Sequence, residues 1–308
     1  MDAIATTGLT KAYKKHLGQS GPPALNALDL AVHEQEVFGF LGRNGAGKTT
    51  TIKILCGLIK PTRGHAEIFG HSVRRRVART HIGYLPENPY FYEYLTPRET
   101  LDFYGKLHGL DAQARAAEWD VLSELLDLRD IADQRVRGFS KGMRQRLGFA
   151  VAMVGDPPLL ILDEPMSGLD PLGRRSIREI ILYLRDRKKT IFFSSHVLGD
   201  VEQICDRVGI LVQGRLAIQG RIDELLARKI KQVEVIVTGV DDTTIETGKK
   251  RCANYRHSEA GHHFYVADVQ TANQLASDLL AKGGQLQEFT PIKESLEDYF
   301  MRQQEVKA

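Results

Sequence analysis

The chain has 308 residues, of which 42% are hydrophobic and 26% charged, a composition that suits a globular protein with one large and one small domain. Its formal net charge of +3 does not indicate nucleic-acid binding, which usually needs a clustered basic face. No stretch approaches the ~18 apolar residues that a membrane-spanning helix needs, so we expect any membrane role to come through a partner protein.

The N-terminal segment and the cysteines predict a cytoplasmic protein. Residues 1–5 lack the basic start and long apolar stretch of a signal peptide. Cys56, Cys205 and Cys252 stand far apart in the sequence, without the spacing of a disulfide framework or a metal site. Isolated cysteines of this kind suit a reducing compartment.

Tyr13 stands before a polar stretch that contains glycine and proline, residues 18–23. An aromatic ring here can stack on an adenine face, and it can equally be an ordinary half-buried tyrosine. The alternating residues 28–32 then predict a half-buried strand.

A glycine-rich loop lies between a predicted buried strand, residues 37–41, and a predicted helix, residues 51–56. The loop, Gly42–Thr50, matches the pattern G-x-x-x-x-G-K-[ST], in which glycines let successive backbone N–H groups face phosphate oxygens. In this pattern Lys48 reaches the β and γ phosphates, and the Thr49 hydroxyl ligates Mg²⁺. We therefore predict a nucleoside triphosphate site. The residues expected to contact the nucleotide are Gly42, Asn44, Gly45, Ala46, Gly47, Lys48, Thr49 and Thr50.

The stretch from about residue 88 to 156 has a helical pattern, which predicts a helical insert in an α/β core. Residues 96–99 form a capping box with proline at the first helical position, and this helix is expected to end near Gly109. A second helix is predicted over residues 112–128, with a buried side formed by Leu122, Leu125 and Leu126. The strands predicted before the insert are residues 66–70 and 81–85.

A second candidate phosphate site opens the helix that follows. Ser140 and Gly142 supply a hydroxyl and a small backbone at a predicted helix N-terminus, where N–H groups favour anions. Taken alone, the same sequence is a common helix N-cap.

An apolar strand, residues 159–162, ends in two carboxylates, Asp163 and Glu164. Adjacent carboxylates at a strand end are costly unless a cation or a proton transfer uses them. Asp163 is expected to serve Mg²⁺ and Glu164 to act as general base for the attacking water, whereas ordinary surface acids are the alternative. A later strand, residues 190–195, delivers His196 at its C-terminal end, where parallel sheets bind ligands.

In this order, the phosphate loop, the Ser140 segment, the two carboxylates and His196 resemble the nucleotide-binding domain of an ABC transporter over about residues 3–220. The resemblance implies an α/β P-loop NTPase core of the ABC ATPase type with a helical subdomain. It also implies hydrolysis of ATP with Mg²⁺ by a dimer that drives a separate transmembrane permease. By the same resemblance, Tyr13 stacks on adenine and His196 senses the γ-phosphate.

The resemblance further implies that each nucleotide is shared between two copies. Ser140 and Gly142 of one copy then meet the γ-phosphate bound by the other. Asp170, predicted to cap a helix that begins at Pro171, would lie in a loop that communicates across the dimer. Residues 140–144, Ser-Lys-Gly-Met-Arg, depart from the commoner Ser-Gly-Gly-Gln in a way typical of ABC-2-type exporters.

Glu87 occupies a position where this family usually has glutamine. One interpretation is that Glu87 ligates Mg²⁺ directly, since hard cations accept carboxylate oxygens. The other is that Glu87 faces the membrane partner and never touches the metal.

Residues 222–308 form a second predicted domain after the ATPase domain, residues 1–221. Beyond residue 221 the chain has 14 acidic and 11 basic residues, a net charge of −3. Residues 1–221 have a net charge of +6, and this change of sign supports a separate unit. The strands and helices expected here predict a small α+β unit. It resembles the C-terminal accessory domain of ABC-2 exporter ATPases, in which the ending Ser295–Phe300 recurs. This domain could either regulate the ATPase or add surface to the dimer, and the sequence leaves both roles open. Because adjacent His262 and His263 point to opposite faces of a strand, no metal site is expected there. The predicted strands are residues 233–237, 263–266 and 285–289, and the predicted helices are residues 271–281 and 295–303.

Together these observations predict the ATP-hydrolysing subunit of an ABC transporter, an exporter, that acts as a homodimer with a membrane permease on the inner face of the cell membrane. A soluble ABC ATPase of the translation or DNA-repair type is the alternative. Tandem cassettes or a long coiled-coil insert would indicate that type, and the chain shows neither. A P-loop kinase or GTPase would leave residues 140–146 unexplained.

Overall fold

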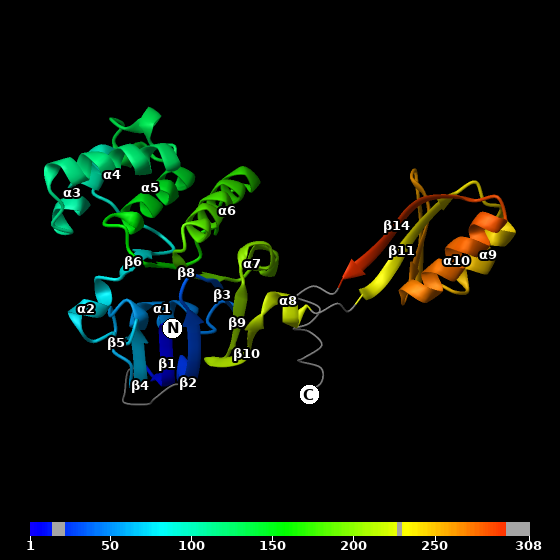
Figure 1. Ribbon diagram of the computed structural model, residues 1–308, viewed down its shortest axis with the longest axis horizontal. Coiled ribbons are helices and arrows are strands. Elements are labelled where there is room, and N and C mark those ends of the chain that lie inside the picture. The colour runs from blue at the N-terminus through cyan, green and yellow to red at the C-terminus, as the bar shows by residue number, and fades with distance from the viewer. Residues whose placement is uncertain (14–21, 227–229, 294–308) are drawn as a thin grey trace. The chain divides into compact units, whose positions relative to one another are not determined.

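The computed structural model describes residues 1–13, 22–226 and 230–293. The chain divides into two compact units, Met1–Ile222 and Asp223–Ala308 (Figure 1). Within the described residues, no helix is both long enough and apolar enough to cross a bilayer.

A six-stranded sheet carries the first unit. Its strand order is β10-β9-β3-β8-β7-β6, and all neighbours pair in parallel except β9 and β10. Parallel strands place their carboxyl ends at one edge, so the segments after β3, β6, β7 and β8 gather there. The strands are β3 (Val37–Leu41), β6 (Ile82–Leu85), β7 (Leu159–Leu162), β8 (Thr190–Ser195), β9 (Arg207–Val212) and β10 (Arg215–Arg221).

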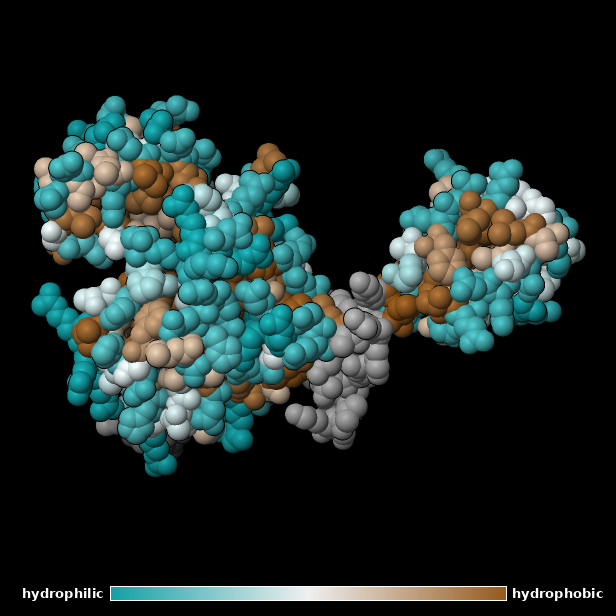
Figure 2. Space-filling model, viewed as in Figure 1, coloured by the Kyte–Doolittle hydropathy of each residue, from teal (hydrophilic) through white to brown (hydrophobic). Residues whose placement is uncertain are grey.

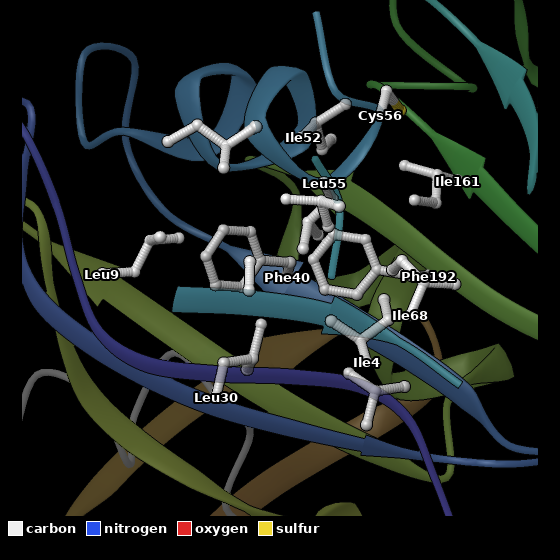
Figure 3. Packing of buried hydrophobic residues seen from close by; sticks show 14 of the residues in the cluster. Ile4, Leu9, Leu30, Phe40, Ile52, Leu55, Cys56, Ile68, Ile161 and Phe192 are labelled. Atoms are coloured by element: carbon white, nitrogen blue, oxygen red, sulfur yellow. The ribbon is translucent and has the colours of Figure 1, made fainter. Parts of the chain in front are cut away.

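A second, antiparallel sheet of order β2-β1-β4-β5 packs with the helix α1 (Lys48–Leu55) in the same unit. Phe40 and Phe192 fill the space between them, with ring centroids 5.2 Å apart. Burying one such ring stabilises the fold by roughly 1.5–3 kcal/mol, so this core holds α1 and its preceding loop in place. The side chains around the two rings in Figure 3 include Ile4, Leu9, Leu30, Ile52, Leu55 and Ile68. The strands of this sheet are β1 (Asp2–Lys11), β2 (Leu25–His33), β4 (Arg63–Ile68) and β5 (His71–Ser72).

Helices fill the stretch between β6 and β7, as the sequence predicts. The capping box at residues 96–99 is confirmed, because the Thr96 hydroxyl accepts from Glu99 N at 3.2 Å and the Glu99 carboxylate accepts from Thr96 N at 2.9 Å. Gly148 lets α5 approach β6 closely, since a Cβ there would lie 2.5 Å from a methyl carbon of Leu85. The helices of this stretch are α3 (Pro97–Leu107), α4 (Ala112–Leu125) and α5 (Lys141–Met153), with the short 3-10 turns η1 (Arg129–Ile131) and η2 (Val136–Gly138); the short helix α2 (Arg76–Arg79) precedes β6.

The second helix of this stretch was predicted to reach residue 128, and that end is wrong. α4 stops at Leu125 because Leu126 leaves helical geometry and Asp127 takes φ +49°. Leu122 and Leu126 are buried as expected, but Leu125 is only half-buried.

Three further helices follow β7, and the boundary between the two units falls within the last of them, after Ile222. Asp170 caps α6 as predicted, its carboxylate accepting from Gly173 N at 2.7 Å. These helices are α6 (Pro171–Asp186), α7 (Leu198–Ile204) and α8 (Ile222–Leu225).

Over the described residues 230–293, the second unit has a four-stranded antiparallel sheet of order β12-β13-β11-β14 and the helices α9 and α10. Its core joins the sheet to α10 through Val233, Val235, Phe264 and Leu275. The predicted strands at 233–237, 263–266 and 285–289 and the helix at 271–281 are confirmed, each with somewhat longer bounds, whereas α9 and β12 were not predicted. The predicted helix at 295–303 lies outside the described residues. The elements are β11 (Ile230–Thr238), α9 (Asp242–Lys249), β12 (Asn254–Ser258), β13 (Gly261–Val266), α10 (Val269–Ala281) and β14 (Gln285–Lys293).

Candidate active site

The loop between β3 and α1 is tightly wound around its glycines. Gly45 and Gly47 have φ angles of +81° and +114°, a region that other residues rarely enter. A Cβ at Gly47 would also lie 2.5 Å from the carbonyl oxygen of Ala24. Because α1 begins at Lys48, its free N–H groups face the loop, as an anion site requires.

Lys48, Glu164 and His196 meet at the carboxyl edge of the sheet, although they come from three separate strand ends. Lys48 is 7% exposed, and its Nζ donates to the carbonyl oxygen of Gly42 at 2.6 Å and lies 3.2 Å from Glu164 Oε1. The other oxygen of Glu164 lies 2.8 Å from His196 Nδ1. Both oxygens of this nearly buried carboxylate are therefore held by nitrogen groups, which offsets its loss of hydration.

Asp163 presents its carboxylate beside Thr49, whose hydroxyl donates to Asp163 Oδ1 at 3.4 Å. These are oxygen ligands of the kind that Mg²⁺ prefers, and a cation would offset the burial of Asp163, which is 2% exposed. The two residues fit a magnesium site. Burial raises the pKa of the nearby Cys56 thiol and Tyr84 phenol far above their ordinary values, and the Asp163 charge adds to both. Burial therefore favours the protonated form of both groups.

A cleft of about 370 Å³ is lined by six of the eight predicted phosphate-loop residues, all except Gly42 and Ala46. Glu87 lines it together with Glu164 and His196, although Glu87 is exposed and has no hydrogen bond or ion pair within the described part of the chain. Tyr13 lies at the side of the phosphate loop, with its hydroxyl 3.5 Å from the Thr50 hydroxyl. The remaining lining residues are Ala24, Arg43, Asn44, Gly45, Gly47, Lys48, Thr49, Thr50 and Ser167.

Ser140, Gly142 and Asp170 lie elsewhere, in a second cleft of about 560 Å³. Ser140 caps α5 by accepting from Met143 N at 3.3 Å, so the helix N-terminus opens into this cleft. None of the phosphate-loop residues lines it. The structure thus separates the predicted site residues into two groups within one chain.

Comparison with known proteins identifies the family. The family model described as ABC transporter matches residues 25–167. An ABC transporter ATP-binding protein of Synechocystis is 42% identical over 305 residues, which cover 98% of this chain and 84% of that protein. The chain belongs to the ATP-binding proteins of ABC transporters.

Two further comparisons agree with this assignment of the ABC ATPase. The bacitracin transport ATP-binding protein BcrA of Bacillus licheniformis is 36% identical over 304 residues, covering 97% of this chain and 96% of BcrA. A solved ATP-binding subunit of an ABC transporter superposes with a TM-score of 0.65 at 32% identity, covering 72% of this chain and 91% of that one. The predicted family, the α/β P-loop fold and the ATPase class are confirmed.

Two buried side chains of the ABC ATPase were not predicted as site residues. Ser194 Oγ donates to Asp163 Oδ1 at 2.7 Å and accepts from Glu164 N at 2.9 Å. Gln145, on α5, donates from Nε2 to the carbonyl oxygen of Pro165 at 2.8 Å, while its Oε1 has no partner in the described structure. Ser194 follows the apolar run Ile191–Phe193, which is the one hint that the sequence offered, whereas Gln145 lies between Arg144 and Arg146 and gave no sign of burial.

Proposed function

We propose that this ABC ATPase acts as a homodimer that binds two Mg-ATP and powers export through a separate membrane permease. The observation that carries the proposal is the pair of clefts. One cleft holds the phosphate loop, Glu164 and His196, and the other holds Ser140, Gly142 and Asp170. A two-fold dimer can bring the second cleft of one copy against the first cleft of its partner.

Within the first cleft, each side chain has a distinct part. Lys48 and the N–H groups at the start of α1 bind the phosphates. Glu164 takes a proton from the attacking water. His196 Nδ1 lies 2.8 Å from the Glu164 carboxylate and helps to hold that carboxylate in place. Thr49 and Asp163 would hold Mg²⁺, which supplies neutralisation of phosphate charge.

Ser140 and Gly142 complete the site from the partner copy. The α5 N-terminus at Ser140 offers free N–H groups to the γ-phosphate in this arrangement. Asp170 lies in the same cleft, so its loop would sense whether the partner's nucleotide is present.

The chain needs a partner to act on a membrane, and part of its surface is suited to one. Hydrophilic residues cover most of the face of the first unit drawn in Figure 2. Tyr90, Tyr92 and Tyr94 are nevertheless 82%, 49% and 62% exposed, on the segment that follows Glu87. Exposed aromatic clusters of this kind mark interaction sites, so we assign them to the permease contact. The similarity to a bacitracin transport protein supports export, and we assign residues 223–308 as the accessory domain.

Membrane fractionation tests this function. We expect the chain to sediment with the membranes of the cells that produce it and its permease, and to leave them in an alkaline carbonate wash, as a peripheral subunit does. Recovery entirely in the soluble fraction, with ATPase activity intact, would contradict the membrane partner and favour a soluble ABC ATPase.

A further inference from the structure

β8 carries a fully buried serine at the point where it passes the two catalytic-site carboxylates. Ser194 has 0% exposure and follows Phe192 and Phe193, which are equally buried. Its one hydroxyl proton is donated to Asp163 Oδ1 at 2.7 Å, and its oxygen accepts from Glu164 N at 2.9 Å. A single hydroxyl therefore links the side chain of one carboxylate to the backbone of the next.

The backbone of Glu164 needs such a link. Its φ of +49° lies in the left-handed region, which side chains with a Cβ seldom enter and which tends to persist only where surrounding contacts hold it. Within the described residues, Ser194 Oγ is the one acceptor for the Glu164 N–H. Without this acceptor the N–H would be buried and unpaired, which is costly.

This backbone angle directs the Glu164 side chain. Because its oxygens contact Lys48 Nζ at 3.2 Å and His196 Nδ1 at 2.8 Å, a small rotation at Glu164 would break both contacts. Even a small displacement of a catalytic group lowers the reaction rate strongly.

We propose that Ser194 is a positioning residue for ATP hydrolysis, which holds the left-handed backbone of Glu164 and so aims its carboxylate. The inference rests on the proposed role of Glu164 as general base. Ser194 itself is enclosed by protein and does not touch the nucleotide cleft, whose lining it does not join. It therefore acts through Glu164 rather than on the substrate.

Two substitutions at Ser194 and one matched control test the proposal. Ser194→Ala should lower kcat by about 10- to 100-fold, with ATP affinity unchanged within about threefold, because positioning affects the reaction more than binding. Ser194→Cys should fall between Ala and wild type, since a thiol is a weak donor and acceptor. The control, Ser123→Ala, removes an equally buried hydroxyl in α4 and should keep the wild-type kcat.

A readout independent of turnover is amide exchange in a peptide that covers residues 159–170. Ser194→Ala should speed exchange there, and Ser123→Ala should not. A double-mutant cycle adds the link to Glu164: on a Glu164→Gln background, Ser194→Ala should lower the residual rate by less than about twofold, because the group it positions is already disabled.

The outcomes separate the two assignments. If Glu164→Gln is inactive while Ser194→Ala and Ser194→Cys turn over within about twofold of wild type, the Ser194 inference is wrong and the base assignment stands. A full multiplicative loss in the double variant would also overturn it. Near-normal turnover in Glu164→Gln would instead remove the base on which the inference depends.

Discussion

Glu164 combines a strained backbone with a carboxylate held on both oxygens. At the scale of single residues this is the feature that most clearly marks the reaction centre, since strained conformations persist where other contacts enforce them. Asp163, the preceding residue, has its own partners in Thr49 and Ser194. The two neighbouring acids therefore have different partners: Asp163 contacts Thr49 and Ser194, and Glu164 contacts Lys48 and His196.

The role of Glu164 predicts the behaviour of Glu164→Gln. An amide cannot take a proton from water, so hydrolysis should fall by the ~10²–10⁴-fold typical of losing a general base. ATP binding should persist, and size-exclusion chromatography with light scattering should show an ATP-bound dimer that does not reopen. Glu179→Gln, which changes an exposed ion pair on α6, is the control and should behave as wild type. Near-normal turnover in Glu164→Gln would exclude it as the base.

The position of Glu87 in the lining of the first cleft allows its two possible roles to be tested. It shares the cleft lining with Thr49 and Glu164, so its carboxylate can reach a metal there or turn toward a membrane partner. If Glu87 ligates Mg²⁺, ATP affinity should depend more steeply on Mg²⁺ in wild type than in Glu87→Gln, because a carboxylate binds the cation more strongly than an amide oxygen. Titration of ATP binding against Mg²⁺ measures this. Superimposable curves would eliminate coordination and leave the partner-sensing role.

Sequence alone predicted those site residues whose signal is local. The phosphate loop is recognised by glycines and a lysine at fixed spacing. Asp163 is recognised by its position at the end of an apolar strand. Ser194 and Gln145 gave no such signal, because their hydrogen bonds join residues 31 and 20 positions apart. Such contacts depend on which strands are neighbours in the sheet and on how α5 packs against the segment after β7. A short sequence motif predicts neither.

At the scale of elements, α5 ties the two clefts together. Its N-terminus at Ser140 opens the second cleft, and one turn later Gln145 bonds to Pro165, directly after Glu164. If α5 moves when a partner's nucleotide binds, the Gln145–Pro165 hydrogen bond would therefore transmit the movement to Glu164 of the same chain.

The Gln145 contact predicts different effects on stability for two substitutions of similar size. Gln145→Met removes the donor together with the unpartnered Oε1, so the loss and the gain should nearly cancel, and the free energy of unfolding should change by less than about 1 kcal/mol. Gln145→Glu sets a buried acceptor against the Pro165 carbonyl oxygen and should destabilise by about 2 kcal/mol or more at neutral pH. Chemical denaturation measures both, with Gln134→Glu at an exposed position as control. Equal stability of the Met and Glu variants would contradict the assigned contact.

Two buried strands of the six-stranded sheet were predicted with the bounds that the structure gives them. β3 and β8 match their predicted bounds, because a buried strand in a parallel sheet is a continuous apolar run. β1 was missed since its pairing with β2 shifts register, for example between Thr6 and Leu9, and Gly8 takes a positive φ, so its alternation is broken. β9 and β10 were not predicted either.

At the scale of the whole molecule, each cleft of a single copy holds only part of the predicted nucleotide site. The first cleft of the ABC ATPase holds the phosphate loop and the base, but no residue of the Ser140 segment lines it. The second cleft has the opposite composition. In the proposed dimer each copy supplies two half-sites, and two copies related by a two-fold axis form two whole ones.

Mixing two inactive variants tests this claim most directly. Lys48→Ala disables the phosphate loop and Ser140→Arg disables the second cleft; thermal unfolding must first show that each folds, because Ser140→Arg also removes a helix cap worth about 1 kcal/mol. In a mixture, heterodimers pair the loop of the Ser140→Arg copy with the second cleft of the Lys48→Ala copy. The account predicts ATP-driven heterodimers and recovery of ATPase activity, with about a quarter of the composite sites intact at an equal ratio under random pairing. Activity that never exceeds the sum of the separate variants, with no nucleotide-driven pairing at any ratio, would show a monomeric ATPase and contradict the shared site.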